Sequence, residues 1–309
     1  MKKIYYIVVV FAILFLAGCG DGIDLPGVNV ETDLNKIPLP DNNVNLEQVE
    51  LKPSTEPMLH EGLHTEEDFQ RIRDKKAAGE EPWVSAYQLL VESQFSQKTA
   101  DTYPTEWIKR GVSGDENYMN AARGATIVYQ QALRWKIEQD DEYAAKAVEN
   151  LNKWVQTCVG VTGNTNLSLA AGLYGYEFAI AGELLRDYGG WDRADFAAFQ
   201  NWLLKVFYPA NDDFLKRHHD TNALHYWANW CLCNIAAKMA IGIVTDRRDI
   251  YNEGIAHLQT GDTNGRLRRA IYHDYAPDYN FAQWQESGRD QGHTLMCVGL
   301  MGIICQLAW

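Results

Sequence analysis

The chain has 309 residues, a net charge of −13 and 46% hydrophobic residues. This length and composition are typical of a globular protein with a sizeable core. The acidic excess argues against nucleic-acid binding, because a phosphate-binding surface needs concentrated positive charge. An acidic ligand would therefore have to be held by a local group of cations.

The first residues have the pattern of an export signal. Lys2 and Lys3 precede an apolar run over 4–16, which is too short for a comfortable transmembrane helix. The run ends in Leu-Ala-Gly-Cys at residues 16–19, which resembles a bacterial lipobox. We therefore expect a signal peptide over 1–19 and a lipid anchor at Cys19 that holds the protein to a membrane of the cell envelope. A plain signal peptide or an uncleaved anchor is the alternative.

The rest of the chain divides into a tether and one domain. Residues 20–56 are rich in Pro, Asn, Asp and Gly with little periodicity, which predicts a flexible tether. Residues 57–309 are enough for one large domain, and strand-like alternation is nearly absent from them. Apolar residues at helical spacing predict helices over 83–95, 118–137, 143–158, 170–188, 196–207, 223–244, 251–258 and 293–309.

Cap and turn residues separate these helices into pairs. Thr65 and the acids after it predict one further helix start, Asp141 suits an N-cap, and the residues 209–212 read as a break. Since no repeat of fixed period is present, we expect an all-α fold, an incomplete (α/α) toroid of helical hairpins, rather than a solenoid. The last predicted helix is apolar almost all round, so it should have neighbours on every side. This indicates an architecture that continues beyond Trp309.

The remaining cysteines predict neither a complete disulfide set nor a metal site. They are odd in number, Cys158, Cys231, Cys233, Cys297 and Cys305. An odd set cannot pair completely within one chain, and all five lie in apolar helical contexts, so we expect small buried residues. Cys231 and Cys233 fall on nearly opposite sides of a helix, which does not suit a shared zinc ion. No other pattern has metal-ligand spacing, and no metal or cofactor is predicted.

Two polar segments, 220–230 and 283–293, stand directly ahead of apolar helices. Such a concentration of polar side chains makes a poor core and a good site. Together the segments supply an arginine, histidines, amides and a tyrosine between aromatic side chains, which suggests a site for an acidic carbohydrate. The side chains concerned are Asn222, His225, Tyr226, Asn229, Trp284, Gln285, Glu286, Arg289 and His293.

The chain resembles the alginate lyase superfamily of polysaccharide lyases in these two polar segments, in 117–135 and in 172–186. The runs His-Tyr-Trp-Ala-Asn-Trp and Gly-Arg-Asp-Gln-Gly-His within the polar segments are the most specific pieces. The resemblance covers roughly 57–309 and implies an incomplete α/α toroid. It also implies cleavage of an anionic 4-linked uronate polymer, alginate first and glucuronan second, by metal-independent β-elimination.

The expected reaction assigns roles to the polar side chains. The carboxylate beside C5 must be neutralised before the C5 proton can leave. Arg289 is expected to do this, because a guanidinium binds a carboxylate with two hydrogen bonds. The amides that would help are those of Asn222, Asn229 and Gln285, and Glu286 would orient Arg289.

Proton transfer requires a base and an acid. Better-known members of the superfamily carry an Asn-His pair before a Trp, and an Arg followed by a His-Tyr pair. Here Asn222 and His225 are separated by two residues, and no Tyr follows His293. His225 or a tyrosine would therefore be the base, and the tyrosines available are Tyr226, Tyr272 and Tyr275. The candidates for the acid are Tyr226, Tyr272 and His293.

Further residues could form neighbouring sugar-binding positions. Trp284 could stack on a sugar ring. Arg123 and Tyr176, from the other two resembling segments, could line a second position. Each of these residues, and each histidine, has a structural alternative as a core residue, and Arg289 could simply pair with Glu286 at a helix start.

Two other functions fit the same scaffold. A glycoside hydrolase on an α/α barrel would need two carboxylates across a sugar, and Glu286 and Asp290 lie four residues apart. A non-catalytic glycan-binding lipoprotein would explain an anchor and aromatic side chains, but it does not need so dense a cluster of Arg, His and amides.

Overall fold

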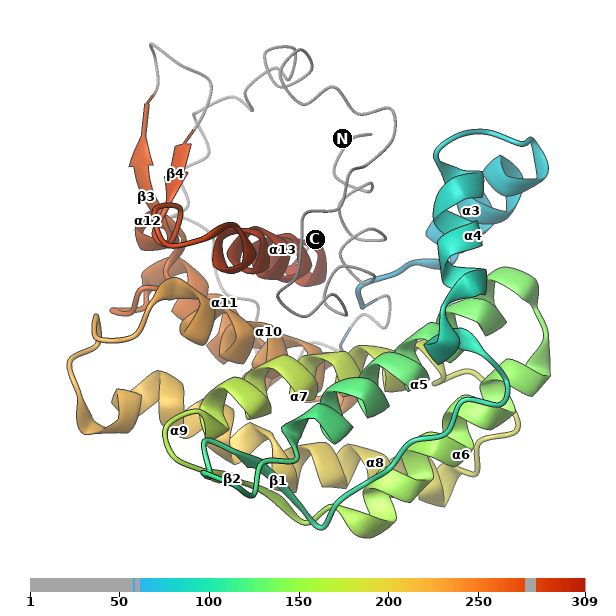
Figure 1. The fold of residues 1–309 in the computed structure, drawn as a ribbon, viewed down its shortest axis with the longest axis horizontal. Helices are drawn as coiled ribbons and strands as arrows, with labels where there is room; N and C mark the ends of the chain where they lie inside the picture. The colour runs from blue at the N-terminus through green and yellow to red at the C-terminus, as the bar shows by residue number, and fades with distance from the viewer. Residues whose placement is uncertain (1–57, 59–61, 276–281, 309) are drawn as a thin grey trace.

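The computed structural model describes residues 58, 62–275 and 282–308, and it confirms the expected all-α fold of helical hairpins (Figure 1). The predicted tether and the signal segment lie outside the described residues. The α-helices are α3 (Glu66–Ala77), α4 (Trp83–Glu92), α5 (Tyr118–Glu138), α6 (Asp141–Thr157), α7 (Leu167–Leu184), α8 (Arg193–Val206), α9 (Tyr208–Arg217), α10 (Ala228–Val244), α11 (Arg248–Thr260), α12 (Leu267–Ala270) and α13 (Gln291–Ala308). The short 3-10 turns are η3 (Gln94–Ser96) and η4 (His218–Asp220).

Four helices, α5, α7, α10 and α13, pack side by side in this order. Helix α6 packs on α5, and helix α11 packs on α10, so each pair forms a hairpin. Within the described part of the chain the helices form an arc and do not close into a barrel (Figure 1). This arrangement is the open toroid that the helical pattern predicts.

Helices α7 and α10 run in the same direction. At the start of α7, the Ser168 carbonyl accepts a hydrogen bond from the Asn234 amide of α10 at 3.2 Å. Just past the end of α7, Arg186 donates to the carbonyl of Val244, the last residue of α10, at 2.8 Å. Because α7 and α10 are parallel, their N-terminal ends and the loops before them lie on the same side of the layer of helices.

Close packing of small and aromatic residues holds the arc together. A Cβ at Gly172 of α7 would lie 2.5 Å from the Cys233 sulfur of α10, so only glycine allows this approach of the two helices. The Phe178 ring packs against Trp202 and Phe207, with centroids 5.2 Å and 6.0 Å away. A fully buried aromatic side chain of this size contributes several kcal/mol (about 3–5) to the free energy of folding.

Helix α3 is held to the arc by its first turn. Thr65 and Asp68 form a capping box at its start. Next to it, the His64 Nε2 lies 2.6 Å from the Tyr129 hydroxyl of α5. Burial lowers the pKa of His64 to about 4, so this ring is neutral near pH 7 and the bond joins two uncharged groups.

Several predicted boundaries were wrong. The break at 209–212 is a second helix, α9, because Pro209 occupies its first turn, where a missing N–H costs nothing. Asp140, not Asp141, caps α6, since its side chain accepts the Glu142 N–H. Helix α10 starts at Ala228 rather than at 223, because the Asn222 side chain accepts the Leu224 N–H and forms a turn there.

Four short strands also occur among the described residues. They form a parallel pair, β1 (Trp107–Arg110) with β2 (Gly160–Gly163), and an antiparallel pair, β3 (Ile271–Asp274) with β4 (Ala282–Trp284). The first pair brings Arg110 over the N-terminal halves of α5 and α7, and the second carries the chain toward α13.

Helix α13 is long and apolar enough to cross a membrane by length and composition alone. One side of it packs on α10 with buried Cys297, Leu300 and Ile304, as a core helix of a globular domain does. Leu295 and Cys305 are exposed, so the expectation of five buried cysteines was wrong for Cys305. The other four cysteines are buried, and all five are free thiols.

Candidate active site

Arg289 lies on the loop before α13 and is held by a buried carboxylate. Its Nη1 donates to the Glu286 Oε1 at 2.9 Å, and its side chain is 50% exposed, whereas that of Glu286 is 1% exposed. The other carboxylate oxygen accepts a weak hydrogen bond from the Cys297 sulfur at 3.5 Å. Burial and the nearby Glu286 raise the pKa of Cys297 to about 12, so the thiol keeps its proton. The Arg289 Nε also lies 3.7 Å from the Asp290 Oδ2, so the guanidinium is held by two carboxylates and remains half-exposed.

His293 is oriented by a carboxylate one turn away. Its Nδ1 lies 2.6 Å from the Asp290 Oδ2, and its backbone N–H donates to the Asp290 Oδ1 at 2.8 Å. These hydrogen bonds from His293 lower the pKa of Asp290 below its usual range. With Nδ1 committed to Asp290, the Nε2 of His293 is the ring nitrogen left for proton transfer.

The segment before α10 joins the Arg289 loop. The Gln285 Oε1 accepts the backbone N–H of Ala228 at 3.0 Å and so satisfies one of the free amides at the start of α10. Asn264 fixes the segment further, because its side-chain amide donates to the carbonyls of Leu224 and Tyr226. The two polar segments that the sequence singles out therefore meet through Gln285.

Side chains of the 222–230 segment differ in exposure. Asn222, His225 and Trp227 are exposed, whereas Tyr226 is only 9% exposed. Asn229 is buried, and within the described residues its side-chain oxygen has no hydrogen-bond partner. A buried amide oxygen without a partner is unusual and marks a position where a ligand or a water would be bound.

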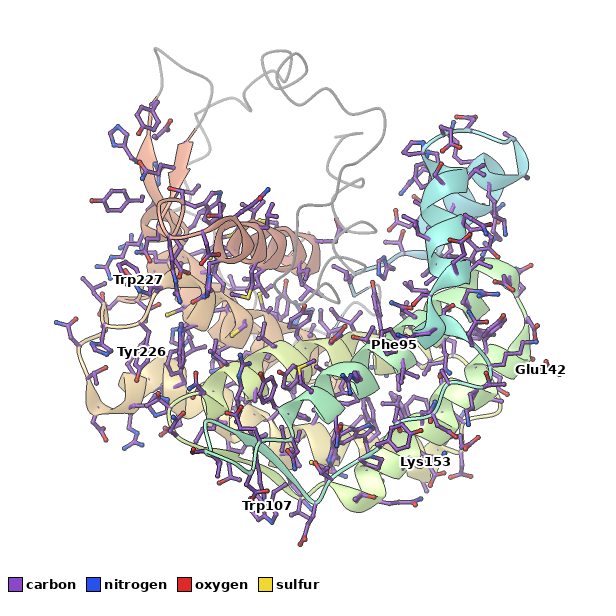
Figure 2. All side chains as sticks on the ribbon, viewed as in Figure 1. Phe95, Trp107, Glu142, Lys153, Tyr226 and Trp227 are labelled. Carbon is purple, nitrogen blue, oxygen red and sulfur yellow. The ribbon has the colours of Figure 1, made fainter. Side chains whose placement is uncertain are left out.

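An aromatic and histidine cluster surrounds Tyr226, whose place in the fold is labelled in Figure 2. The ring of His225 lies 4.9 Å from it and that of His219 lies 5.7 Å from it. The His219 Nε2 is also 3.0 Å from the hydroxyl of Ser168 at the start of α7. Sequence reasoning missed His219, although two adjacent histidines at a helix end could have drawn attention to it.

The backbone at this point is strained. His218, His219 and Asp220 all have positive φ values, of 50°, 52° and 58°. Each such residue costs of the order of 1 kcal/mol unless its surroundings hold it. Here the Thr221 hydroxyl donates to the His218 carbonyl at 2.6 Å, and Arg217 pairs with Asp220. Strain of this kind is typical of functional sites.

The β3–β4 pair carries the other predicted residues. Trp284 packs against the core, which favours its structural alternative. Tyr272 is 69% exposed on β3, so no packing holds its ring in place. Tyr275 donates from its hydroxyl to the Gln283 side-chain oxygen at 3.1 Å. Of the tyrosines considered for proton transfer, Tyr226 is the one that its neighbours hold firmly.

A cavity of about 640 Å³ lies over the N-terminal halves of α5 and α7. It is lined by both residues that the sequence suggested for a neighbouring sugar position, Arg123 and Tyr176, together with Phe95, Arg110, Tyr174 and Glu177. In Figure 2, Phe95 lies toward one end of the arc, and Tyr226 and Trp227 lie toward the other. Sequence reasoning missed Arg110 and Glu177.

The buried sulfur of Cys233 on α10 lies beside Gly172 of α7. Burial raises the pKa of Cys233, so this thiol keeps its proton. The thiol of Cys297 contacts Glu286. No group of three or more His, Cys, Asp or Glu side chains is placed to hold a metal ion in the described part of the chain.

Comparison with known proteins identifies the family. The family model described as alginate lyase matches residues 72–276, which is more than half of the chain and includes the cavity and the 222–230 segment. The match ends before the Arg289 loop. A search of the curated proteins found no match. Membership decides against the glycoside hydrolase and the non-catalytic binding protein. The chain belongs to the alginate lyase family, and it is a polysaccharide lyase that acts on an anionic polysaccharide.

Proposed function

We propose that this lyase cleaves a 4-linked uronate polymer, alginate first and glucuronan-type polymers second, by metal-independent β-elimination at the Arg289 loop. The observation that carries the proposal is the state of Arg289, a half-exposed guanidinium held from behind by a buried carboxylate. A guanidinium fixed in this way can bind a sugar carboxylate without first losing side-chain freedom.

Charge neutralisation is the main barrier to this reaction. The C5 proton is weakly acidic while the neighbouring carboxylate is charged, so donors must stabilise the negative charge that spreads onto it. Arg289 supplies two N–H groups for this purpose. The amides of Asn222, Asn229 and Gln285 are the further donors. The oxygens of Asn222 and Gln285 accept backbone N–H groups, which leaves their NH2 groups to donate, and Asn229 has an NH2 group as well.

We assign the two proton transfers to the histidines of the two polar segments. His225 is exposed and, among the described residues, has no carboxylate partner, which suits a neutral base for the C5 proton. His293 is bound to the Asp290 carboxylate, which suits a ring that carries a proton to the leaving oxygen at C4. Tyr226, held edge-on to His225, is the alternative acid. Tyr272, mostly exposed, is less suitable.

The proposal is tested by ultraviolet absorbance, because β-elimination creates a carbon–carbon double bond and hydrolysis does not. A protein comprising residues 20–309 is incubated with polymannuronate, polyguluronate, glucuronan and a neutral glycan, with and without chelator. We expect a chelator-insensitive rise with one polyuronate, and a fall of at least about a hundredfold in kcat for His225→Ala and for His293→Ala. New reducing ends without absorbance would overturn the proposal, and full activity of either variant would remove that histidine from the reaction.

We also propose that the protein is anchored to the cell envelope by a lipid on Cys19. The support is the lipobox-like sequence over 16–19 behind a short apolar run. The Cys19→Ser variant is expected to move from the membrane fraction to the soluble fraction of bacterial cells, because it lacks the sulfur to which the lipid would be attached. A variant that stays in the membrane fraction would favour an uncleaved apolar segment as the anchor.

A further inference from the structure

The cavity over α5 and α7 contains two arginines that are not neutralised. Arg110 donates to the Tyr174 hydroxyl at 3.4 Å, and its guanidinium lies 4.7 Å from the centre of the Tyr118 ring. Arg123 is exposed on α5. In the parts of the chain that the structure describes, neither arginine lies within 4.0 Å of a carboxylate oxygen. This is notable because the whole chain has a net charge of −13.

Arg110 is held in place by the backbone rather than by an opposite charge. It ends β1, which pairs with β2, and its carbonyl oxygen would lie 1.8 Å from a Cβ at Gly163 of β2. Gly163 has a φ of 143°, which disfavours any other residue. This contact fixes the start of the Arg110 side chain above α7. The guanidinium is therefore positioned before any ligand binds.

Glu177 is the acidic side chain among the lining residues of the cavity. Its Oε1 accepts the Thr126 hydroxyl of α5 at 3.2 Å, and no described cation pairs with it. Burial raises the pKa of Glu177 to about 8, which the hydrogen bond from Thr126 only partly offsets. At neutral pH the carboxyl is mostly protonated, so it has an O–H to donate and does not oppose the arginines.

We propose that the cavity over α5 and α7 is a subsite for an acidic sugar unit, in which Arg110 and Arg123 bind the sugar carboxylate and the Glu177 carboxyl donates a hydrogen bond to the same sugar. The inference rests on the proposed function, since it places another unit of the same polymer in the cavity. Phe95, Tyr174 and Tyr176 provide the flat apolar surfaces on which a sugar ring packs.

The titratable groups near Glu177 keep their charge state near pH 8, where Glu177 loses its proton. Burial raises the pKa values of Tyr129, Tyr174 and Tyr176, so these phenols stay neutral in mildly alkaline solution. His64, bound to Tyr129, has its pKa lowered to about 4 and is neutral as well. The two arginines stay positive. Of these groups Glu177 alone ionises near pH 8, and affinity should fall as it does.

Calorimetric binding of a mannuronate trisaccharide to the full chain tests this dependence on pH. For the natural protein we expect Kd to rise about tenfold between about pH 6 and about pH 9, because roughly nine-tenths of Glu177 ionises one unit above its pKa. For Glu177→Gln, which is neutral throughout, Kd should change less than about twofold over the same range. An equal rise in both proteins would overturn the inference.

A second pair of variants keeps the test valid if Glu177→Gln does not fold. Arg123→Gln changes an exposed side chain of α5, and Arg193→Gln, on α8, is its matched exposed control. At about pH 6 we expect Kd to rise about tenfold for the first and less than twofold for the second, since one charge-assisted contact is lost. A carboxyl-reduced trisaccharide, which lacks the group that Arg123 would bind, should bind Arg123→Gln and the natural protein with Kd values within about twofold. Unchanged affinity of Arg123→Gln would also overturn the inference.

The outcome separates this inference from the proposed function. If the trisaccharide binds with the expected dependence on pH but no polyuronate is cleaved, the subsite stands and the proposed reaction fails. If a polyuronate is cleaved and neither Glu177→Gln nor Arg123→Gln changes binding as expected, the reaction stands and the subsite fails.

Discussion

Replacement of Arg289 by Ala is expected to lower kcat/KM about a thousandfold, which corresponds to about 4 kcal/mol of lost transition-state stabilisation. The guanidinium neutralises the carboxylate that must accept charge as the C5 proton leaves, and the neighbouring amides can replace only part of that effect. Arg289→Lys keeps the charge and loses the paired hydrogen bonds, so we expect an intermediate loss of about tenfold to a hundredfold. Initial rates of absorbance on the cleaved polyuronate measure both variants.

Arg247 provides a matched control for Arg289. Arg247 is 48% exposed and pairs with Asp249, much as Arg289 is 50% exposed and pairs with Glu286. Arg247→Ala should therefore lose a similar surface charge and leave kcat/KM within about twofold. If Arg289→Ala kept more than a tenth of the natural activity, Arg289 would not be the neutralising group, and the proposal for this loop would have to be abandoned.

The sequence predicted the inner helices well because burial and periodicity act together there. The predicted helix 118–137 corresponds to α5, Tyr118–Glu138. Errors occurred where a local interaction overrides periodicity. Leu224 and Trp227 continue an apolar pattern, yet Asn222 forms a turn there and the helix begins only at Ala228. Pro209 reads as a break in the sequence, yet it lies in the first turn of α9.

The candidate site was predictable in part, for a related reason. A dense polar segment ahead of an apolar helix is visible in a sequence, and this drew attention to Arg289 and His225. Residues that meet only through the fold are not visible in this way. Arg110 enters the cavity because β1 pairs with β2, and Glu177 appears in the sequence as one acid in an apolar helix. Its neutral state depends on burial by neighbours that are distant in the chain.

Replacement of Lys238 by Met is expected to destabilise the protein by about 3 kcal/mol. The Lys238 side chain is 0% exposed, and its Nζ lies 2.8 Å from the Asp212 Oδ1 of α9 and 2.5 Å from the Glu253 Oε2 of α11. Methionine fills a similar volume but removes the buried cation that Asp212, 21% exposed, and Glu253, 40% exposed, share. Denaturant unfolding measures the loss, and the m-value should not change if the folded state stays compact.

Two further variants show whether the loss arises from the buried charge. Lys216 pairs with the same Asp212 at 2.8 Å but is 57% exposed, so Lys216→Met should cost less than about 0.5 kcal/mol. In Lys238→Met, Asp212 still pairs with Lys216, so adding Glu253→Gln removes the carboxylate that has lost its cation and should restore about 1 kcal/mol. Equal losses for Lys216→Met and Lys238→Met would contradict this account. Burial of the Lys238 charge between α9, α10 and α11 would then make no difference to the free energy of unfolding.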